Sequence, residues 1–235
     1  MQVISFALLM MLFQRADAAP PPSVIVVNGS AQVFVAPDEA TVRLGIVRQA
    51  PTAQAAQDQA SVVGKEILAA ITKVGVPANQ IQTARLVLTP MYAPRGPEAR
   101  DAPRIVSYNA NNTVSVRVEN LALVGPVIDA GLKAGANQVE GVQFGLRNDL
   151  PSREEAIKQA VQEARGKAQA MADALRVNLA EVLEATEGGI SVVPFAEAGF
   201  ASRMAVAAAD ASTPVSPGQI QVNANVTVRF RITPK

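Results

Sequence analysis

The chain alternates between two hydrophobic periods, and this alternation constrains its fold more than any other feature of the sequence. The last segment alternates apolar and polar residues, which predicts a long β-strand. Its apolar positions are Val222, Ala224, Val226, Val228, Phe230 and Ile232. An earlier segment repeats apolar residues at the helical period, which predicts a long amphipathic helix. Those positions are Ile157, Val161, Ala164, Ala168, Met171 and Leu175. Segments of both kinds in one chain predict a fold that contains both helices and strands.

The same helical period predicts two further helices. Thr52 is an N-cap candidate for a helix that ends at Gly75, a residue that readily adopts the left-handed conformation of a C-cap. The apolar positions of this helix are Ala56, Ala60, Val63, Ile67, Ala70 and Val74. Residues 121–134 predict a shorter helix. The long helix is predicted to begin with a capping box formed by Ser152 and Glu155.

Apolar, β-branched segments around the helices predict further β-strands. The predicted strands before the final one are 24–35, 40–46, 81–91, 105–118, 139–146 and 181–186. The turn at Pro37-Asp38 predicts a hairpin between the first two, and Gly188-Gly189 is predicted to break the chain after the sixth. One face of 105–118 carries Val106, Tyr108, Ala110, Val114, Val116 and Val118.

A short motif occurs twice in the chain. Gly75-Val-Pro-Ala-Asn-Gln-Ile follows the first helix, and Gly135-Ala-Asn-Gln-Val follows the second, each ahead of a predicted strand. The repetition is consistent with two related strand-helix-strand halves, and two short matches are equally expected by chance.

Residues 1–18 predict a secretory signal peptide. An apolar run over 3–13 precedes Ala16-Asp17-Ala18, the small-x-small pattern at which signal peptidase cleaves. No Lys or Arg precedes the run, which departs from the usual pattern, and the run is shorter than the about 20 apolar residues that span a bilayer. We therefore expect cleavage near Ala18 and a periplasmic protein. Residues 19–235 are expected to form one domain with mobile loops at 92–103 and 194–217.

The chain contains no His and no Cys, which removes several kinds of chemistry. It lacks the usual general base near neutral pH, the thiolate nucleophile and the commonest nitrogen ligand of zinc and copper. Without cysteine there is no disulfide, so a hydrophobic core must stabilise the fold. We accordingly predict no catalytic residues, no cofactor-binding residues, no metal ligands and no cofactor.

Charge and composition also argue against nucleic acid as a partner. The net charge is +1 and aromatic residues make up 4% of the chain, so neither a basic surface nor a stacking platform is expected. A hydrolase that uses carboxylates alone remains open. The candidate acids are Asp38, Glu39, Glu154, Glu155 and Glu163. Each also has a structural explanation: a turn for the first pair, the first turn of the long helix for the second, and the exposed face of that helix for Glu163.

Five motifs occur in an order that resembles the SIMPL-domain family of bacterial exported proteins. They are VNGSAQVFVAPDEATVRLGI (27–46), QIQT (80–83), GANQVEGVQFGL (135–146), EEAIKQAVQEARGKAQAMADAL (154–175) and PGQIQVNANVTVRFRI (217–232). The resemblance covers nearly the whole chain after residue 18 and departs from the family in the two loops. It implies an α+β fold with a mixed or mostly antiparallel sheet on which about three helices pack. It also implies self-assembly into periplasmic oligomers and a role in envelope stress, oxidative stress or channel-like assemblies. It brings no catalytic residues.

We predict a non-enzymatic, exported cell-envelope protein that forms homo-oligomers through sheet edges or helix seams. The final strand is long and free of strand-breaking proline, and the long helix has a regular apolar seam; both invite a partner, and both could equally be satisfied inside one core. Association with the envelope or the outer membrane is a further expectation from the resemblance. Two alternatives stay open: a periplasmic small-ligand binding module, which needs an apolar pocket with a few polar groups, and a hydrolase that uses carboxylates or a Ser–Lys pair.

Overall fold

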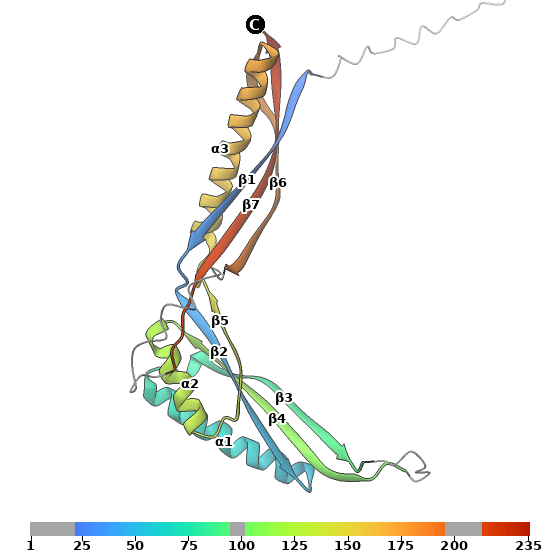
Figure 1. The fold of residues 1–235 in the computed structure, drawn as a ribbon, viewed down its shortest axis with the longest axis vertical. Helices are drawn as coiled ribbons and strands as arrows, with labels where there is room; N and C mark the ends of the chain where they lie inside the picture. The colour runs from blue at the N-terminus through green and yellow to red at the C-terminus, as the bar shows by residue number, and fades with distance from the viewer. Residues whose placement is uncertain (1–21, 95–101, 196–212) are drawn as a thin grey trace, which may run out of the picture.

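The segments with strand and helix periodicity fold into two lobes that follow one another along the long axis of the molecule (Figure 1). The computed structural model describes residues 22–94, 102–195 and 213–235. The predicted signal peptide, 1–18, lies outside these ranges, as do 95–101 and 196–212 of the predicted loops. The strands are β1 Val24–Val35, β2 Glu39–Ala50, β3 Ile81–Tyr92, β4 Ile105–Val118, β5 Gln138–Gly145, β6 Val177–Phe195 and β7 Gln219–Pro234. The helices are α1 Ala53–Val74, α2 Val124–Lys133 and α3 Leu150–Leu175, with 3₁₀ turns at Ala78–Gln80 and Leu121–Leu123.

One lobe contains an antiparallel sheet in the order β3-β4-β2-β5, and we call it the four-stranded lobe. α1 connects β2 to β3, and α2 connects β4 to β5. This is the β-α-β-β-α-β topology of ferredoxin-like folds, and it contains two strand-helix-strand halves. Gly75 and Gly135 follow the two helices with φ of 109° and 103°, a region that favours glycine. The repeated motif therefore occupies the same place in each half.

α1 and α2 cover one face of this sheet and enclose the first hydrophobic core. Buried side chains of β2, β4 and α1 supply most of it, among them Val42, Leu44, Ile46, Val114, Val116, Ile67 and Ile71. Thr52 caps α1 as predicted, because its side-chain oxygen accepts a hydrogen bond from the Ala55 N–H at 3.2 Å. The predicted apolar face of α1 is confirmed except near its end, where Ile71 is buried in place of Ala70.

The other lobe contains an antiparallel sheet in the order β1-β7-β6 with α3 on one face, and we call it the three-stranded lobe. Its core is separate from the first and includes Ile25, Val27, Ile220, Val222, Val228 and Phe230. The alternation predicted for the last strand is confirmed, since the even-numbered positions of β7 face α3. The α+β class is confirmed, with two antiparallel sheets where a single sheet was expected.

α3 contacts its sheet through a stripe of alanines. Ala156, Ala160, Ala164, Ala168 and Ala172 are all fully buried. The predicted seam is therefore wrong at Val161, Met171 and Leu175, which are exposed. The reason is the close approach of helix and strand: a Cβ placed on Gly29 of β1 would lie 2.0 Å from the Ala160 carbonyl oxygen. At that separation only small side chains fit, so size rather than hydrophobicity selects the buried face.

The predicted start of α3 is also wrong. The helix begins at Leu150, ahead of Ser152, and no side chain caps it. Pro151 lies in the first turn, where its missing N–H costs nothing, so the helix extends past the expected capping box. Glu154 and Glu155 consequently lie beyond the first turn, and Glu155 accepts a hydrogen bond from the Gln159 side-chain amide at 2.9 Å.

The predicted hairpin between the first two strands does not form. β1 pairs with β7 along its whole length, from Val24 opposite Arg231 to Val35 opposite Ile220, while β2 pairs with β4 and β5. Pro37-Asp38 is thus a link between two sheets rather than a hairpin turn. A local turn signal cannot reveal that a partner distant in sequence offers a longer register.

β6 is longer than predicted. It continues through Gly188-Gly189 to Phe195, and the register with β7 shifts between Glu187 and Gly189. Gly189 has φ of 120°, so the glycine pair forms a bulge in the strand instead of ending it. Pro194 and Phe195, assigned to a loop from composition, belong to β6, and Tyr92, assigned to the other loop, belongs to β3.

Candidate functional site

The acids of the described residues include two with shifted pKa values. No cluster of three or more Asp or Glu within the described ranges could hold a metal ion. Two acids have pKa values below their ordinary range: Asp129, which accepts hydrogen bonds from the Thr213 hydroxyl and N–H, and Glu163, which accepts one from the Ser30 N–H. A general acid near neutral pH needs a raised pKa instead. The surfaces of the two lobes offer other candidate sites.

The outer edge of β1 is covered by side chains of α3. In an antiparallel ladder the N–H and C=O of one residue point to the same side, and those of Asn28 and Ser30 point away from β7. The Ser30 N–H donates to the Glu163 carboxylate, and the Lys167 ammonium donates to the Asn28 carbonyl at 3.1 Å. Lys167 and Glu163 also form an ion pair at 2.9 Å. These contacts obstruct the middle of this edge for pairing with another strand.

β7 lies in the middle of its sheet, which corrects one argument for assembly. The sequence pattern predicts that this strand invites pairing with another chain, but β1 and β6 occupy both of its sides. Its length and regularity are satisfied inside one chain. The free edge of this sheet is β6, which has no strand on its outer side among the described residues.

The β6 edge combines open backbone with features that resist pairing. Its register with β7 shifts at three places, between Leu179 and Val182, between Val182 and Glu184, and at the glycine pair. Pro194 lies opposite Ile220, whose backbone groups point to β1, so the proline nitrogen is on the free edge and offers no donor there. Bulges and proline are common ways to protect an edge strand. β6 is therefore a weaker assembly surface than its length indicates.

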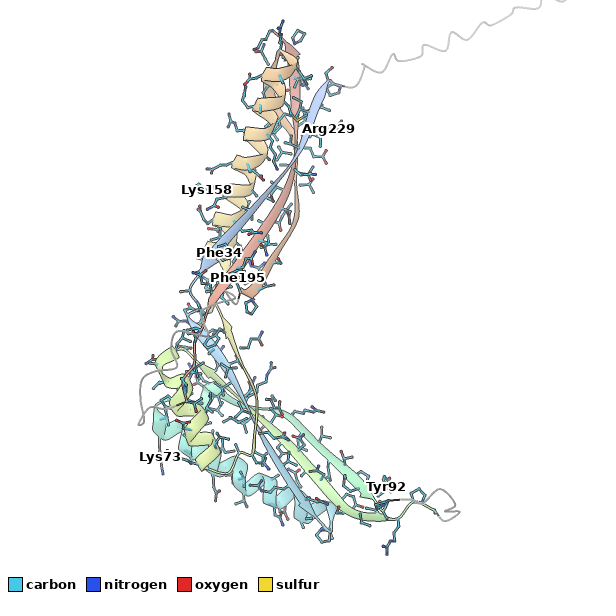
Figure 2. The ribbon with its side chains drawn as sticks, in the orientation of Figure 1. Phe34, Lys73, Tyr92, Lys158, Phe195 and Arg229 are labelled. Carbon is cyan, nitrogen blue, oxygen red and sulfur yellow. The ribbon has the colours of Figure 1, made fainter. Side chains whose placement is uncertain are left out.

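The most concentrated exposed apolar surface lies on the ends of β3 and β4. These ends reach past α1 and α2 as a hairpin, with Tyr92 near the end of β3 (Figures 1 and 2). We call the apolar side chains here the arm residues: Leu88, Met91, Tyr92, Ile105 and Val106. Their exposed fractions run from 39% to 52%. Tyr92 lies directly opposite Ile105, so these two residues share one face, and a register shift between Met91 and Tyr92 places Met91 on that face as well.

The sequence analysis missed the arm residues because it assigned them to a loop or to buried strand ends. A signal was present in the run Ile105-Val106, where consecutive apolar residues break the alternation and place one on each face. α3 adds a second, smaller surface. Its exposed Val161, Met171 and Leu175 belong to the predicted seam, and no described element covers them.

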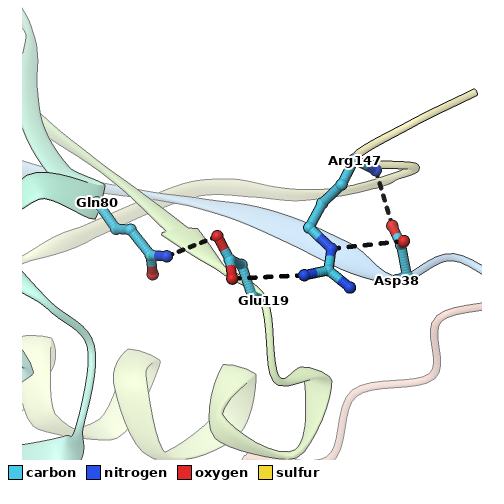
Figure 3. Close-up of polar contacts among 4 residues, drawn as sticks. All are labelled: Asp38, Gln80, Glu119 and Arg147. Atoms are coloured by element: carbon cyan, nitrogen blue, oxygen red, sulfur yellow. Dashed lines mark hydrogen bonds and ion pairs between the residues drawn. The ribbon is translucent and has the colours of Figure 1, made fainter.

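Polar contacts hold the junction between the lobes (Figure 3). Asp38, in the link from β1 to β2, accepts a hydrogen bond from the Arg147 N–H at 2.7 Å and contacts the guanidinium at 3.4 Å. Arg147 lies in the link from β5 to α3 and also reaches Glu119 at 3.5 Å, which accepts a hydrogen bond from Gln80 at 2.7 Å. The two links that join the lobes are thus tied to each other. Asp38 acts here as a structural acid.

A third connection between the lobes is held by α2. The Thr213 hydroxyl donates to Asp129 at 2.6 Å and its N–H donates at 3.2 Å. Val215 packs against the core of the four-stranded lobe before the chain enters β7. The chain that leads from β6 to β7 is thereby attached to the other lobe.

Comparison with known proteins agrees with this architecture. The profile of the family described as "SIMPL: Protein of unknown function (DUF541)" matches residues 25–230. The chain belongs to the SIMPL family. The match includes every described strand and helix from β1 into β7, so both lobes are part of the family fold.

Relatives of this SIMPL protein are named for location or not characterised. The 26 kDa periplasmic immunogenic protein of Brucella melitensis is 34% identical over 223 residues, which are 93% of this chain and 88% of that protein. The protein of the same name from Brucella abortus has the same identity and coverage. The uncharacterized protein YggE of Escherichia coli K12 is 27% identical over 169 residues, 72% of this chain and 67% of that protein. Within the described ranges of the SIMPL chain, no helix has the length and apolar character to cross a membrane.

Proposed function

We propose that this SIMPL protein is an exported, non-enzymatic component of the cell envelope that assembles with copies of itself, and that the arm residues make the principal contact. The single observation that carries the proposal is the arm: a projecting hairpin with five large apolar side chains that no described element of the same chain covers. Met91, Tyr92 and Ile105 share one face of the arm, and Leu88 and Val106 lie on the other. Patches of exposed apolar residues mark interaction surfaces.

Two further observations support export and assembly. The Brucella relatives carry the word periplasmic in their names, and residues 1–18 have the pattern of a signal peptide. The edge of β1 is covered by Glu163 and Lys167, and that of β6 is interrupted by bulges and Pro194. Sheet extension through the three-stranded lobe is therefore disfavoured, and side-chain contacts of the arm are the better candidate.

The contacts of three described acids support a non-enzymatic role. The lowered pKa values of Asp129 and Glu163 are explained by hydrogen bonds that tie structural elements together. Asp38 is used in the junction. A role in stress response or in a channel-like assembly, implied by the family resemblance, would be a consequence of the assembly's geometry.

The test is the absolute mass of the protein purified from cells that express the full-length chain, measured by light scattering over a concentration series. We expect a defined multimer. The double variant Tyr92→Ser with Ile105→Ser removes two facing arm side chains. Loss of a contact at the centre of an interface costs about 2 kcal/mol or more, so the dissociation constant should rise at least roughly thirtyfold.

The matched control is Met171→Ser with Leu175→Ser, which removes exposed apolar surface from α3. It should leave the multimer unchanged, and circular dichroism should show that both double variants are folded. A wild-type monomer at all concentrations would refute assembly. A multimer that survives the arm variant but not the α3 variant would transfer the contact to α3.

A further inference from the structure

The outer edge of β3 offers free backbone groups to another strand. β3 lies at the end of the order β3-β4-β2-β5, and no described strand lies on its outer side (Figure 1). In an antiparallel ladder the N–H and C=O of one residue point to the same side of the strand, and this side alternates from residue to residue. The residues of β3 that face outward can therefore be found by following the alternation across the sheet.

The alternation is fixed at Val47 of β2. The Val47 N–H donates to the Asn137 side-chain oxygen at 2.8 Å, and the Asn137 amide nitrogen donates to the Val47 carbonyl at 3.0 Å. Asn137 immediately precedes β5, so the backbone groups of Val47 point to β5. Those of its neighbours, Ile46 and Arg48, consequently point to β4.

The same alternation reaches β3 through β4. The two β4 residues opposite Ile46 and Arg48 point back to β2. Asn111, between them, therefore points to β3, where it lies opposite Val87. The backbone groups of Val87 face β4, so the residues on either side of it, 86 and 88, present their N–H and C=O groups at the free edge.

The side chains beside these free groups are apolar and exposed. Leu86 is 57% exposed and Leu88 is 39% exposed, and α1 leaves this strand largely uncovered. Leu68 of α1 is also exposed and lines a hollow together with Leu86. Free backbone groups flanked by exposed apolar side chains make an edge suited to strand pairing.

The segment that can pair regularly is residues 85–89. The register with β4 shifts between Thr83 and Arg85, which ends the regular part of the edge on one side. Pro90 has no N–H to donate and ends it on the other side. Val87 is the central residue of this segment.

Two copies of this segment match each other in antiparallel pairing. With a twofold axis at Val87, each Leu86 lies opposite the partner's Leu88, and facing residues whose backbone groups point to each other exchange both hydrogen bonds. The leucines of both copies form one apolar row on the face that carries α1. Twofold contacts between identical surfaces are the commonest in homo-oligomers.

Charge and the position of the arm favour a second copy as the partner. Arg85 is the one charged residue of β3, and it would lie opposite the partner's Thr89, so no like charges meet. The arm continues from Pro90, so in this pairing the arm of each copy runs beside residues 81–84 of the other. The arm residues and the edge therefore belong to one continuous contact.

We propose that two copies of this chain pair β3 with β3 about a twofold axis at Val87, so that their four-stranded sheets become one continuous sheet. This inference rests on the proposed assembly and names a backbone contact within it.

Cross-linking through a single cysteine tests the pairing, because the chain has no cysteine of its own. At the axis the two copies of residue 87 form a pair without hydrogen bonds, whose Cα atoms are about 4.5 Å apart, within the range that a disulfide spans. Val87→Cys in the full-length protein should therefore give a covalent dimer under mild oxidation, and a reductant should reverse it.

Thr89→Cys is the matched control. Thr89 is on the same face of β3 and is more exposed than Val87. In the proposed register its two copies are offset by four residues, about 13 Å along the strand, so they are too far apart for a disulfide. Accessibility alone would make the control react at least as readily.

A second pair of variants places a charge on each free edge. Leu86→Lys should raise the dissociation constant of the multimer at least about tenfold, because lysine at an edge opposes strand pairing. Val182→Lys adds the same charge at an exposed position of β6 and should leave the constant unchanged. Circular dichroism of both variants checks that they are folded.

The possible failures of the two proposals are distinguishable. A multimer in which Val87→Cys cross-links no better than Thr89→Cys would overturn the β3 pairing and leave the assembly intact. Equal dissociation constants for Leu86→Lys and Val182→Lys would do the same. A monomer at all concentrations by light scattering would overturn both proposals.

Discussion

Substitution of Gly29 by alanine tests the close contact between α3 and β1. A Cβ at this position would lie 2.0 Å from the Ala160 carbonyl oxygen, 2.8 Å from the Ala164 nitrogen and 2.9 Å from the Ala164 Cβ. All three atoms belong to the helix backbone or to its first side-chain carbon, so no side-chain rotation can relieve the clash. The Gly29 backbone is in the ordinary β region, and the strain comes from contact alone.

The size of the effect follows from the distance that α3 must move. Cβ contacts under 3.0 Å are essentially never found, so the helix must shift by about 1 Å at Ala160. Such a shift opens the interface along the buried alanine stripe. Overpacking of a well-filled core costs about 1–3 kcal/mol, and the rigid neighbours here place the expected loss near 3 kcal/mol. For a chain of this size, that lowers the melting temperature by about 6–12 °C.

Differential scanning calorimetry measures the change, and hydrogen exchange locates it. Exchange should accelerate in α3 and β1 and stay unchanged in α1, because the two cores are separate. Gly166→Ala is the matched control on the same helix, where no atom lies within 4 Å of the added Cβ. Its better helix propensity should stabilise the protein by about 1 kcal/mol. A Gly29→Ala protein within about 0.5 kcal/mol of wild type would refute the close-contact argument.

Two other predictions concern the same lobe. The hydrogen bond from the Ser30 N–H lowers the pKa of Glu163 below its ordinary value of 4.5, and the contact with Lys167 lowers it further. The stability that the ionised Glu163 contributes is therefore complete above about that pH and is lost as the pH falls through the lowered pKa. Glu163→Gln should flatten the acid side of a stability–pH curve from urea unfolding, and an unchanged curve would contradict the contact. Phe34 and Phe195, labelled in Figure 2, form an edge-to-face pair with ring centroids 5.1 Å apart. A double-mutant cycle with leucine at both positions should give a coupling free energy of about 0.5–1.5 kcal/mol. No coupling would show that the end of β6 is not held by this pair.

Local signals in the sequence predicted much of the fold correctly. Thr52 and Gly75 define the ends of α1, because capping depends on hydrogen bonds within a few residues. The even-numbered positions of β7 were assigned to the buried face from alternation alone, because the strand period is set by the backbone. The repeated glycine motif follows both helices of the four-stranded lobe, although two such short matches are equally expected by chance.

The errors arose where a distant partner decides the outcome. Pro37-Asp38 has the sequence of a hairpin turn, but β1 pairs with β7 along its whole length instead of with β2. Gly188-Gly189 has the sequence of a strand end, but β6 continues through it as a bulge because the strand pairs with β7 on both sides. The seam of α3 was assigned by hydrophobicity, whereas the nearness of β1 selects alanine. In each case the sequence pattern was present and its local interpretation was wrong.

The candidate surfaces depended most on tertiary structure. Absence of His and Cys limited the chemistry from the start, since no fold can supply a missing functional group. Whether an apolar residue is buried depends instead on what packs over it, as Tyr92 and Ile105 show on the arm. The same holds for the free backbone groups of Leu86 and Leu88, since the order of the strands decides which edge is open. Residue chemistry and local periodicity are properties of the chain, while exposure and hydrogen-bond satisfaction are properties of the packed molecule.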